Sequence, residues 1–305
     1  MGRSLHALVL LGAAMAALGG AACAAPDASE ADAEQGDDAL IGGKAASATQ
    51  FPATVYLKSG CTATKVAPKR LLTAAHCVLD PATVSLRFPK GSRISIAREP
   101  SKGYADLEVA AVDVHPAWLK ACEDAYCAAS SVTARLDAAD VAVIELATDL
   151  ADVPVATVAS APLTAGERVT VLGFGCTAGV LVPDTRDALT LRYAETRLVP
   201  ADRAVHDGSA VLAADVPQVA GIYSLTAGPG AARSKVGLCP GDSGGALYAK
   251  RDGVLVVVGV NANYTLGPEA KDSVGLPITN WHTRLDDASR HGVGAWLKAV
   301  GVTVK

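Results

Sequence analysis

Beyond residue 40 the apolar positions of this chain fall in short runs that Gly, Pro, Asp and Thr interrupt. Runs of this length are typical of β-strands rather than of helices. The runs that we expect to form strands are 53–57, 70–72, 83–86, 108–112, 141–146, 168–172 and 254–260. Because they follow one another closely, they leave little room for crossover helices. The pattern therefore predicts an all-β fold of two antiparallel barrels side by side.

The apolar positions change to a helical spacing near the end of the chain. Leu285, Val293, Trp296, Leu297 and Val300 fit one face of a helix, although Gly292 and Gly294 interrupt it. We expect one terminal helix over residues 286–300, lying on the body of the protein.

The first 25 residues have the layout of a secretory signal peptide. Arg3 precedes an apolar stretch at 7–18, and small residues occupy 19–25. Residues 7–25 carry no charge, so an uncleaved membrane anchor is the alternative. A further alternative is a bacterial lipoprotein signal with Cys23 as the lipid acceptor, although Gly20 departs from that pattern. We expect a secreted protein that associates with a membrane only if Cys23 is lipidated.

Residues 26–39 form an acidic segment without Lys or Arg and without apolar periodicity. A propeptide or a plain linker fits this composition. Residues 1–39 contain one Arg and six acidic residues, so the formal net charge of −4 leaves about +1 for residues 40–305. The charge of the body therefore gives no argument for a nucleic-acid partner.

Half of the 305 residues are apolar, which is enough to bury a large core. Once Cys23 is assigned to the leader or to a lipid, six of the seven cysteines remain, and six cysteines in an exported chain predict three disulfides. These are Cys61, Cys77, Cys122, Cys127, Cys176 and Cys239. No pair has C-x-x-C spacing, so we expect no metal site.

Three segments contain residues that can carry chemistry. His76 lies beside Cys77 in Thr-Ala-Ala-His-Cys, with another cysteine 16 residues earlier. Ser243 lies between glycines in Gly-Asp-Ser-Gly-Gly, which lets the backbone turn tightly around an open hydroxyl. Asp140 enters an apolar run, where a buried carboxylate needs a partner. Each alone has a plainer interpretation: a structural histidine, a glycine turn, an ordinary strand end.

Together, and in this order, these segments resemble the trypsin-like serine proteases. Residues 40–43 (Leu-Ile-Gly-Gly) resemble the mature start of that family, and Phe51-Pro52 follows at its distance. Gly-Phe-Gly at 173–175 and His-Thr-Arg-Leu at 282–285 resemble two further motifs. The resemblance implies a protease domain over 40–305 with six strands in each barrel. It also implies a monomeric serine endopeptidase that acts on proteins or peptides without a cofactor.

The resemblance also assigns roles to residues. Ser243 would be the nucleophile, His76 the general base and then acid, and Asp140 the group that holds the imidazole. The backbone N–H groups of Gly241 and Ser243 would form the oxyanion hole. Asp242 would pair with the α-amino group released when the leader is cut, so the uncut chain would be a zymogen.

The mature start departs from the family, because Leu40 stands where Ile is usual and no basic residue precedes it. We expect cleavage after Ala39, with cleavage between Leu40 and Ile41 as the alternative. The 64 residues between His76 and Asp140 exceed the family's usual spacing. The excess would include a surface loop bearing Cys122 and Cys127.

By the resemblance, Cys61 pairs with Cys77. The family's usual cysteines after the nucleophile are absent, because Ala249 and residues 261–264 contain none. Cys239 then needs another partner, and we expect Cys176. Cys122 would pair with Cys127.

The resemblance implies Gly237 at the base of the substrate pocket, six residues before the nucleophile. Walls would come from residues 262–264 (Ala262, Asn263 and Tyr264) and from about Asn280. Without an acid at its base the pocket cannot select Arg or Lys, so we expect a small or medium uncharged residue before the cleaved bond, the P1 residue. Glu269 or Asp272 in the intervening loop could change this preference.

Two other classes of function fit parts of the pattern. Gly-Asp-Ser-Gly-Gly also matches the nucleophile elbow of α/β-hydrolases, with Asp286 or Asp287 and His291 following in the right order. That elbow needs a helix directly after the serine, whereas residues 246–248 favour a strand. A catalytically inactive protease homologue acting as a binding module is the second alternative, although all three triad residues are present.

Overall fold

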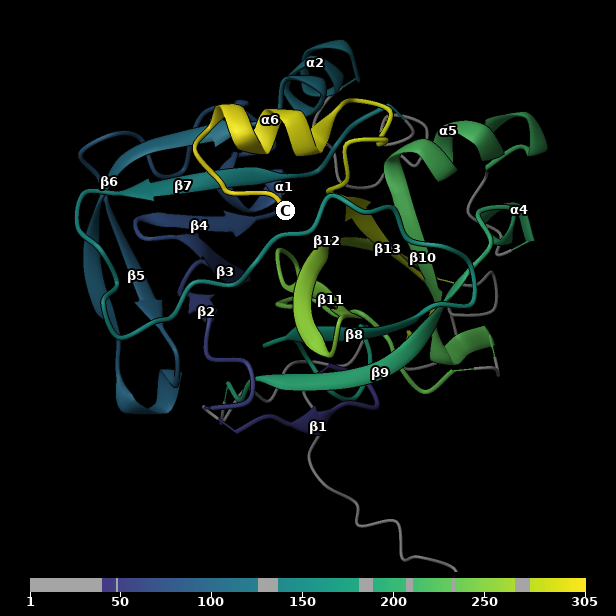
Figure 1. The fold of residues 1–305 in the computed structure, drawn as a ribbon, viewed down its shortest axis with the longest axis horizontal. Coiled ribbons are helices and arrows are strands. Elements are labelled where there is room, and N and C mark those ends of the chain that lie inside the picture. Colours follow the sequence, from purple (N-terminus) through teal and green to yellow (C-terminus); the bar gives the residue numbers. More distant parts are fainter. Residues whose placement is uncertain are drawn as a thin grey trace, which may run out of the picture. The chain divides into compact units, whose positions relative to one another are not determined.

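The computed structural model describes residues 40–47, 49–125, 137–180, 189–206, 211–231, 234–266 and 275–305. The expected signal and acidic segments, Cys127, Glu269 and Asp272 lie outside these residues. Within them the chain forms two antiparallel six-stranded β-barrels side by side (Figure 1). The expected all-β fold is confirmed.

The first barrel closes in the strand order β2-β3-β4-β7-β6-β5. Its strands are β2 (Thr54–Leu57), β3 (Cys61–Ala67), β4 (Arg70–Thr73), β5 (Arg93–Ala97), β6 (Ala105–Val114) and β7 (Ala142–Leu146). The pairing of β4 with β7 sets Leu72 opposite Val143. This pairing brings the chain just after β4 close to the chain just before β7.

The second barrel closes through the pairing of β8 with β9. Its strands are β8 (Arg168–Gly173), β9 (Arg192–Val199), β10 (Tyr223–Ala227), β11 (Ala246–Arg251), β12 (Val254–Leu266) and β13 (Pro277–Arg284). The short strand β1 (Lys44–Ala45) adds to β9. Ser243 lies three residues before the start of β11, so a strand and not a helix follows it, and the nucleophile elbow of an α/β-hydrolase is excluded.

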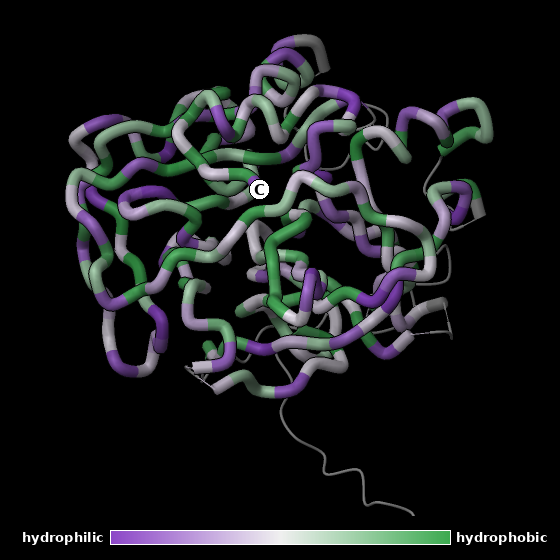
Figure 2. The backbone as a smooth tube through the Cα atoms, in the orientation of Figure 1, coloured by the Kyte–Doolittle hydropathy of each residue, from purple (hydrophilic) through white to green (hydrophobic). Residues whose placement is uncertain are grey.

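One apolar core continues from the first barrel into its junction with the second. It contains Leu72 and Ile144 of the first barrel, Val257 and Val260 of β12, and Leu297 near the C-terminus. Hydrophobic and hydrophilic positions alternate along the backbone of both barrels (Figure 2). The shared core fixes the two barrels against each other.

Short helices connect or cover the strands. They are α1 (Ala75–Val78), α2 (Pro116–Ala125), α4 (Arg203–His206), α5 (Val216–Ile222) and α6 (Val293–Ala299), with 3-10 turns at Pro100–Lys102, Ala213–Asp215 and Pro229–Ala231. The expected C-terminal helix is present as α6 but is shorter than 286–300. Gly292 has a left-handed φ of 61°, and the Ser289 hydroxyl accepts the Val293 N–H, so the helix begins only at Val293.

The prediction of a strand at 83–86 is wrong, because this segment forms a turn. Asp80 Oδ1 accepts the N–H groups of Ala82 and Thr83, and the Val84 N–H donates to the Asp80 carbonyl. These bonds fold the segment into a turn in which Val84 has a φ of 55°. A side-chain acceptor that competes for backbone N–H groups thus overrides the apolar alternation.

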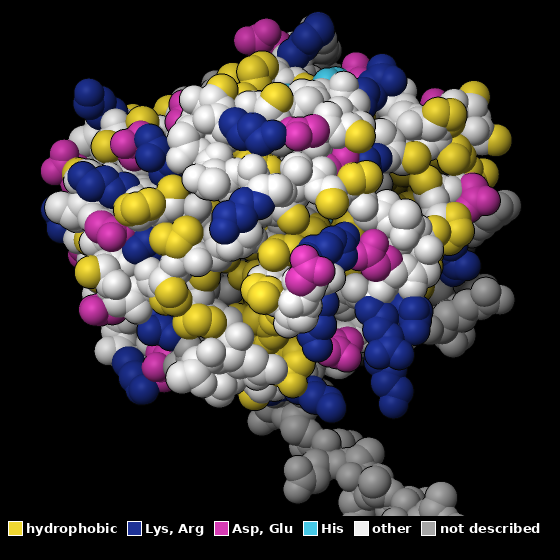
Figure 3. Space-filling view, viewed as in Figure 1, with side chains coloured by type: hydrophobic (Ala, Val, Ile, Leu, Met, Phe, Trp, Pro, Cys, Tyr) yellow, Lys and Arg dark blue, Asp and Glu magenta, His cyan; other side chains and the backbone are white. Residues whose placement is uncertain are grey.

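On the face seen in Figure 3, basic and acidic side chains are interspersed over both barrels. Of the helices in the described ranges, none combines the length and apolarity that crossing a bilayer requires.

Ile144 gives a test of the shared core. Its side chain is fully buried, so we expect Ile144→Ala to lower the free energy of unfolding by about 2–5 kcal/mol, measured by denaturant titration of the Ser243→Ala protein. The control is Val254→Ala, because Val254 is 61% exposed and its replacement costs at most about 0.5 kcal/mol. Equal effects of the two variants would contradict this description of the core.

Candidate active site

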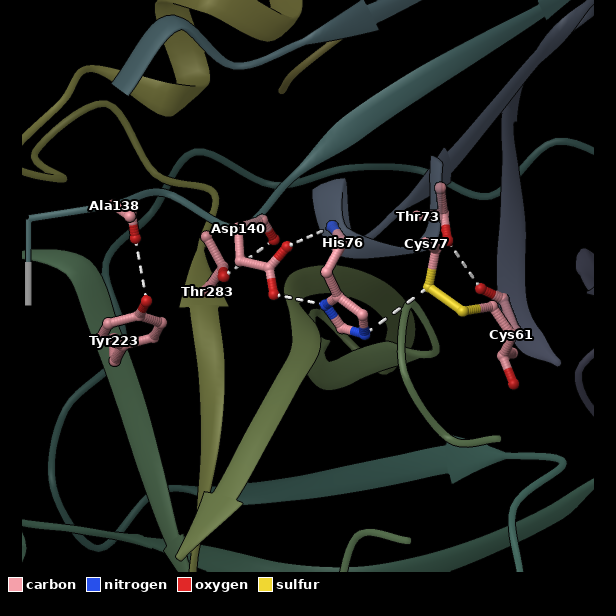
Figure 4. Close-up of polar contacts among 9 residues, drawn as sticks. Cys61, Thr73, His76, Cys77, Ala138, Asp140, Tyr223 and Thr283 are labelled. Atoms are coloured by element: carbon pink, nitrogen blue, oxygen red, sulfur yellow. Dashed lines mark hydrogen bonds and ion pairs between the residues drawn. A yellow bond between two sulfur atoms is a disulfide. The ribbon is translucent and has the colours of Figure 1, made fainter. Parts of the chain in front are cut away.

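His76 is placed by the short helix α1, which follows β4 at the end of the first barrel. A disulfide joins the neighbouring Cys77 to Cys61 on β3, with Cα atoms 6.2 Å apart. The disulfide ties α1 to the barrel wall beside the imidazole (Figure 4). The His76 side chain remains 28% exposed, so it is open on one side.

Asp140 holds His76 by two hydrogen bonds. Its Oδ2 lies 2.7 Å from His76 Nδ1, and its Oδ1 accepts the His76 backbone N–H at 3.0 Å. Since the buried carboxylate accepts a hydrogen bond from Nδ1–H, it selects the tautomer that leaves Nε2 free to take a proton. Figure 4 shows the carboxylate facing both groups.

The second barrel holds the segment that carries Asp140. The Thr283 hydroxyl on β13 donates to the Asp140 carbonyl at 3.0 Å. The Tyr223 hydroxyl on β10 donates to the Ala138 carbonyl at 2.8 Å. The position of the carboxylate in the first barrel therefore depends on hydrogen bonds from the second (Figure 4).

Ser243 and His76 line the same cavity, whose volume is about 190 Å³. No hydrogen bond joins the Ser243 hydroxyl to His76 in the part of the chain described, and His76 Nε2 lies 3.8 Å from Cys77 Sγ. Such catalytic hydrogen bonds are often long in unliganded enzymes and form when substrate binds. The expected triad residues are thus brought to one cavity, with the Asp–His pair already bonded.

The loop around Ser243 leaves two backbone N–H groups without an acceptor. Within residues 239–245, the N–H groups that donate to protein acceptors are those of Cys239, Asp242, Gly244 and Gly245. The N–H groups of Gly241 and Ser243 donate to no atom of the described residues. They remain available to an external acceptor such as a substrate carbonyl oxygen.

Gly241 and Gly244 give this loop its shape. Gly241 has a φ of 109° and Gly244 a φ of 81°, values that favour glycine. A Cβ on Gly244 would lie 2.1 Å from Thr73 Oγ1. The backbone conformation therefore favours glycine at both positions, and at Gly244 a side chain would also clash with Thr73.

A fully buried carboxylate, that of Asp242, lies under the loop. Its Oδ1 accepts the Gly175 N–H at 2.8 Å and its Oδ2 accepts the Cys239 N–H at 2.9 Å. A Cβ on Gly173 or Gly175 would lie 1.9 Å or 2.5 Å from atoms of this carboxylate. The Gly-Phe-Gly segment therefore makes room for Asp242.

Leu40 is fully buried, and Ile41 exchanges two 3.1 Å backbone hydrogen bonds with Gly237. Ile41 also packs against the disulfide between Cys176 and Cys239, whose Cα atoms are 5.4 Å apart. The segment expected to become the mature start thus lies beside the loop that holds Asp242.

Three of the residues expected in the substrate pocket line the cavity, namely Ala262, Asn263 and Tyr264. Gly237 and Asn280 do not. The buried Asn280 side chain lies behind the cavity wall, where its Oδ1 accepts the Leu238 N–H at 2.8 Å and its Nδ2 donates to the Val236 carbonyl at 3.1 Å. Since Leu238 lines the cavity, Asn280 holds this part of the wall from behind.

A family model described as Trypsin matches residues 40–279. The chain therefore belongs to the trypsin family. No curated protein matches it.

In this trypsin-family chain, Trp118, Leu238 and Pro240 also line the cavity, and sequence reasoning missed them. Trp118 lies on α2, with its ring centroid 6.5 Å from that of His76. The apolar spacing of residues 116–125 indicates a helix but does not predict that Trp118 reaches the cavity.

Ligand atoms of Cys61, His76 and Cys77 lie within 4.8 Å of one another. Both sulfur atoms belong to the disulfide, so this group offers no thiolate to a metal ion. The alternative hydrolase residues have other neighbours: Asp286 pairs with Arg284, Asp287 pairs with Lys298, and His291 Nε2 lies 3.4 Å from Asp137 Oδ1.

Burial raises the pKa of Asp242 to about 7, against the opposing effect of its two N–H donors. Since the pKa in the unfolded chain is near 3.8, the folded state binds the proton more tightly, and stability falls as the pH rises from about 4 to 7. We expect the uncut Ser243→Ala chain to lose on the order of 2–4 kcal/mol over this range because of Asp242.

The measurement is the free energy of unfolding against pH, for this protein and for the same protein with Asp242→Asn. The added substitution should flatten the dependence between pH 4 and 7. Parallel curves would show that the pKa of Asp242 is not raised by burial and does not cause the pH dependence.

Proposed function

We propose that this protein is a serine endopeptidase with His76, Asp140 and Ser243 as its catalytic triad. The trypsin family supports serine protease function in general. The observation that carries the specific proposal is the 2.7 Å contact between Asp140 Oδ2 and His76 Nδ1 at a cavity that also contains Ser243. Proteins or peptides are the substrates that the family implies.

In the proposed reaction Ser243 Oγ attacks the carbonyl carbon of the scissile peptide while His76 Nε2 takes its proton. The carbonyl oxygen becomes an oxyanion that accepts the N–H groups of Gly241 and Ser243, each contributing about 3–4 kcal/mol. His76 then protonates the leaving amine as the C–N bond breaks. Water hydrolyses the acyl-enzyme by the same steps, with His76 again as base.

The family match and the burial of Leu40 support a zymogen. Cleavage after Ala39 would give Leu40 a charged α-amino group beside the loop of Asp242, and cleavage after Leu40 would give it to Ile41. Either cation would stabilise the ionised carboxylate, which has no Lys or Arg partner among the described residues. Residues 1–25 would then be the signal peptide, or contain a lipoprotein signal with Cys23 as the lipid acceptor, and 26–39 would be the propeptide or linker of a secreted protein.

The triad proposal is tested with a fluorophosphonate, which labels only an activated serine. We expect wild-type protein that begins at Leu40 or Ile41 to be labelled and Ser243→Ala to stay unlabelled. Ser92→Ala is a matched control, because the Ser92 hydroxyl is buried without a partner in the described structure, and it should be labelled like wild type.

In the same series Asp140→Asn should lower kcat by about 10⁴-fold, since an amide favours the wrong imidazole tautomer. Unlabelled wild-type protein, correctly cut and folded, would favour the inactive homologue that acts as a binding module.

The small volume of the cavity, about 190 Å³, and the wall that Asn280 holds at Leu238 support a preference for small or medium uncharged P1 residues. A panel of peptide substrates that differ only at P1 should therefore give the highest kcat/KM with Ala, and Asn280→Gly should raise the turnover of Phe relative to Ala by about tenfold. Fastest turnover of Arg or Lys substrates by wild type would contradict the preference.

A further inference from the structure

Thr62, on β3, is a fully buried threonine that bonds to the loop of the nucleophile from the opposite barrel. Its hydroxyl donates to the Gly241 carbonyl at 2.8 Å. Its backbone N–H donates to the Ser243 carbonyl at 2.8 Å. Two groups of one residue thus hold Gly241 and Ser243, whose N–H groups have no acceptor among the described residues.

The Thr62 hydroxyl is itself fixed in orientation. Thr62 Oγ1 accepts the Phe174 N–H at 3.2 Å, so the single hydroxyl proton is directed to the Gly241 carbonyl. The Thr62 carbonyl accepts the Thr73 hydroxyl at 2.9 Å, which holds the backbone of Thr62 in place. The threonine is therefore a rigid donor.

Gly241 needs such a donor because glycine rotates easily about its backbone bonds. The peptide on its N-terminal side contains the oxyanion-binding N–H and is held at the Pro240 carbonyl by the Cys176 N–H, at 3.3 Å. The peptide on its C-terminal side is held at the Gly241 carbonyl by Thr62 and at the Asp242 N–H by the Cys239 carbonyl, at 3.0 Å. With both peptide planes fixed, the direction of the Gly241 N–H is fixed too.

We infer that Thr62 is a positioning residue for the oxyanion hole, acting through the Gly241 carbonyl. This inference rests on the proposed function. Loss of the hydroxyl leaves this peptide with the bond from the Asp242 N–H alone among the described residues, so the Gly241 carbonyl turns more freely. The Gly241 N–H then points away from the developing oxyanion in part of the population. Transition-state stabilisation falls, whereas substrate binding in the cavity does not.

The test compares Thr62→Val, which keeps the shape and removes the hydroxyl, with Thr62→Ser, which keeps the hydroxyl. With a peptide p-nitroanilide that has Ala at P1, we expect Thr62→Val to lower kcat by at least about tenfold at nearly unchanged KM. The inhibition constant of the matching peptide aldehyde should rise by the same factor, because its hemiacetal oxygen occupies the oxyanion position. Thr62→Ser should stay within about threefold of wild type.

Thr279→Val is the matched control, since Thr279 is also fully buried but its hydroxyl has no partner in the described part of the chain. It should keep wild-type kcat and aldehyde affinity. If Thr62→Val does not fold, Thr62→Ala replaces it, because alanine adds no methyl group against the Gly241 carbonyl. Thermal unfolding of each variant identifies those that fold.

A folded Thr62→Val or Thr62→Ala protein with wild-type kcat and aldehyde affinity would overturn the inference. A loss in Thr62→Ser equal to that in Thr62→Val would also overturn it, since the hydroxyl would then not matter. Wild-type protein that neither hydrolyses the substrate nor reacts with fluorophosphonate would instead overturn the proposed function, and this inference with it.

Discussion

Hydrogen bonds between the two barrels hold the residues of the proposed triad in place. Thr283 and Tyr223 of the second barrel fix the segment of Asp140, and Thr62 of the first barrel fixes the loop of Ser243. Neither barrel contains a complete site, because each supplies reactive groups that the other orients. The shared apolar core brings the barrels together, and these directed bonds set the alignment.

The loop of Ser243 has a well-paired backbone but covers a buried carboxylate whose ionisation is unfavourable. Most of its backbone groups are paired, and its glycines adopt conformations closed to other residues. Under it, the buried Asp242 carboxylate relies on two N–H donors alone. Among the described residues no Lys or Arg pairs with this buried carboxylate. It lies next to the buried segment of Leu40, and the proposed cleavage would supply a positively charged α-amino group there.

The sequence predicted the barrels and, among the residues at the cavity, His76, Asp140, Ser243 and residues 262–264, because motifs such as Gly-Asp-Ser-Gly-Gly join chemistry to backbone geometry at fixed spacing. It did not predict the turn at 83–86, where Asp80 bonds locally, or Trp118, which reaches the cavity from a helix without a motif. It also did not predict the bond from Thr62 to Gly241 or the bonds of Asn280, which it placed on the pocket wall. Both depend on contacts between positions far apart in the chain, which no local pattern records.

The bond from Thr62 to Gly241 has a consequence for recombination among related proteins. The two residues are 179 positions apart and belong to different barrels. A hybrid that took one barrel from this chain and the other from a relative without a hydroxyl at that position could fold with intact cores and still inherit a loosely held loop. The two halves of the molecule must therefore diverge together at their junction, even where each half is stable in itself.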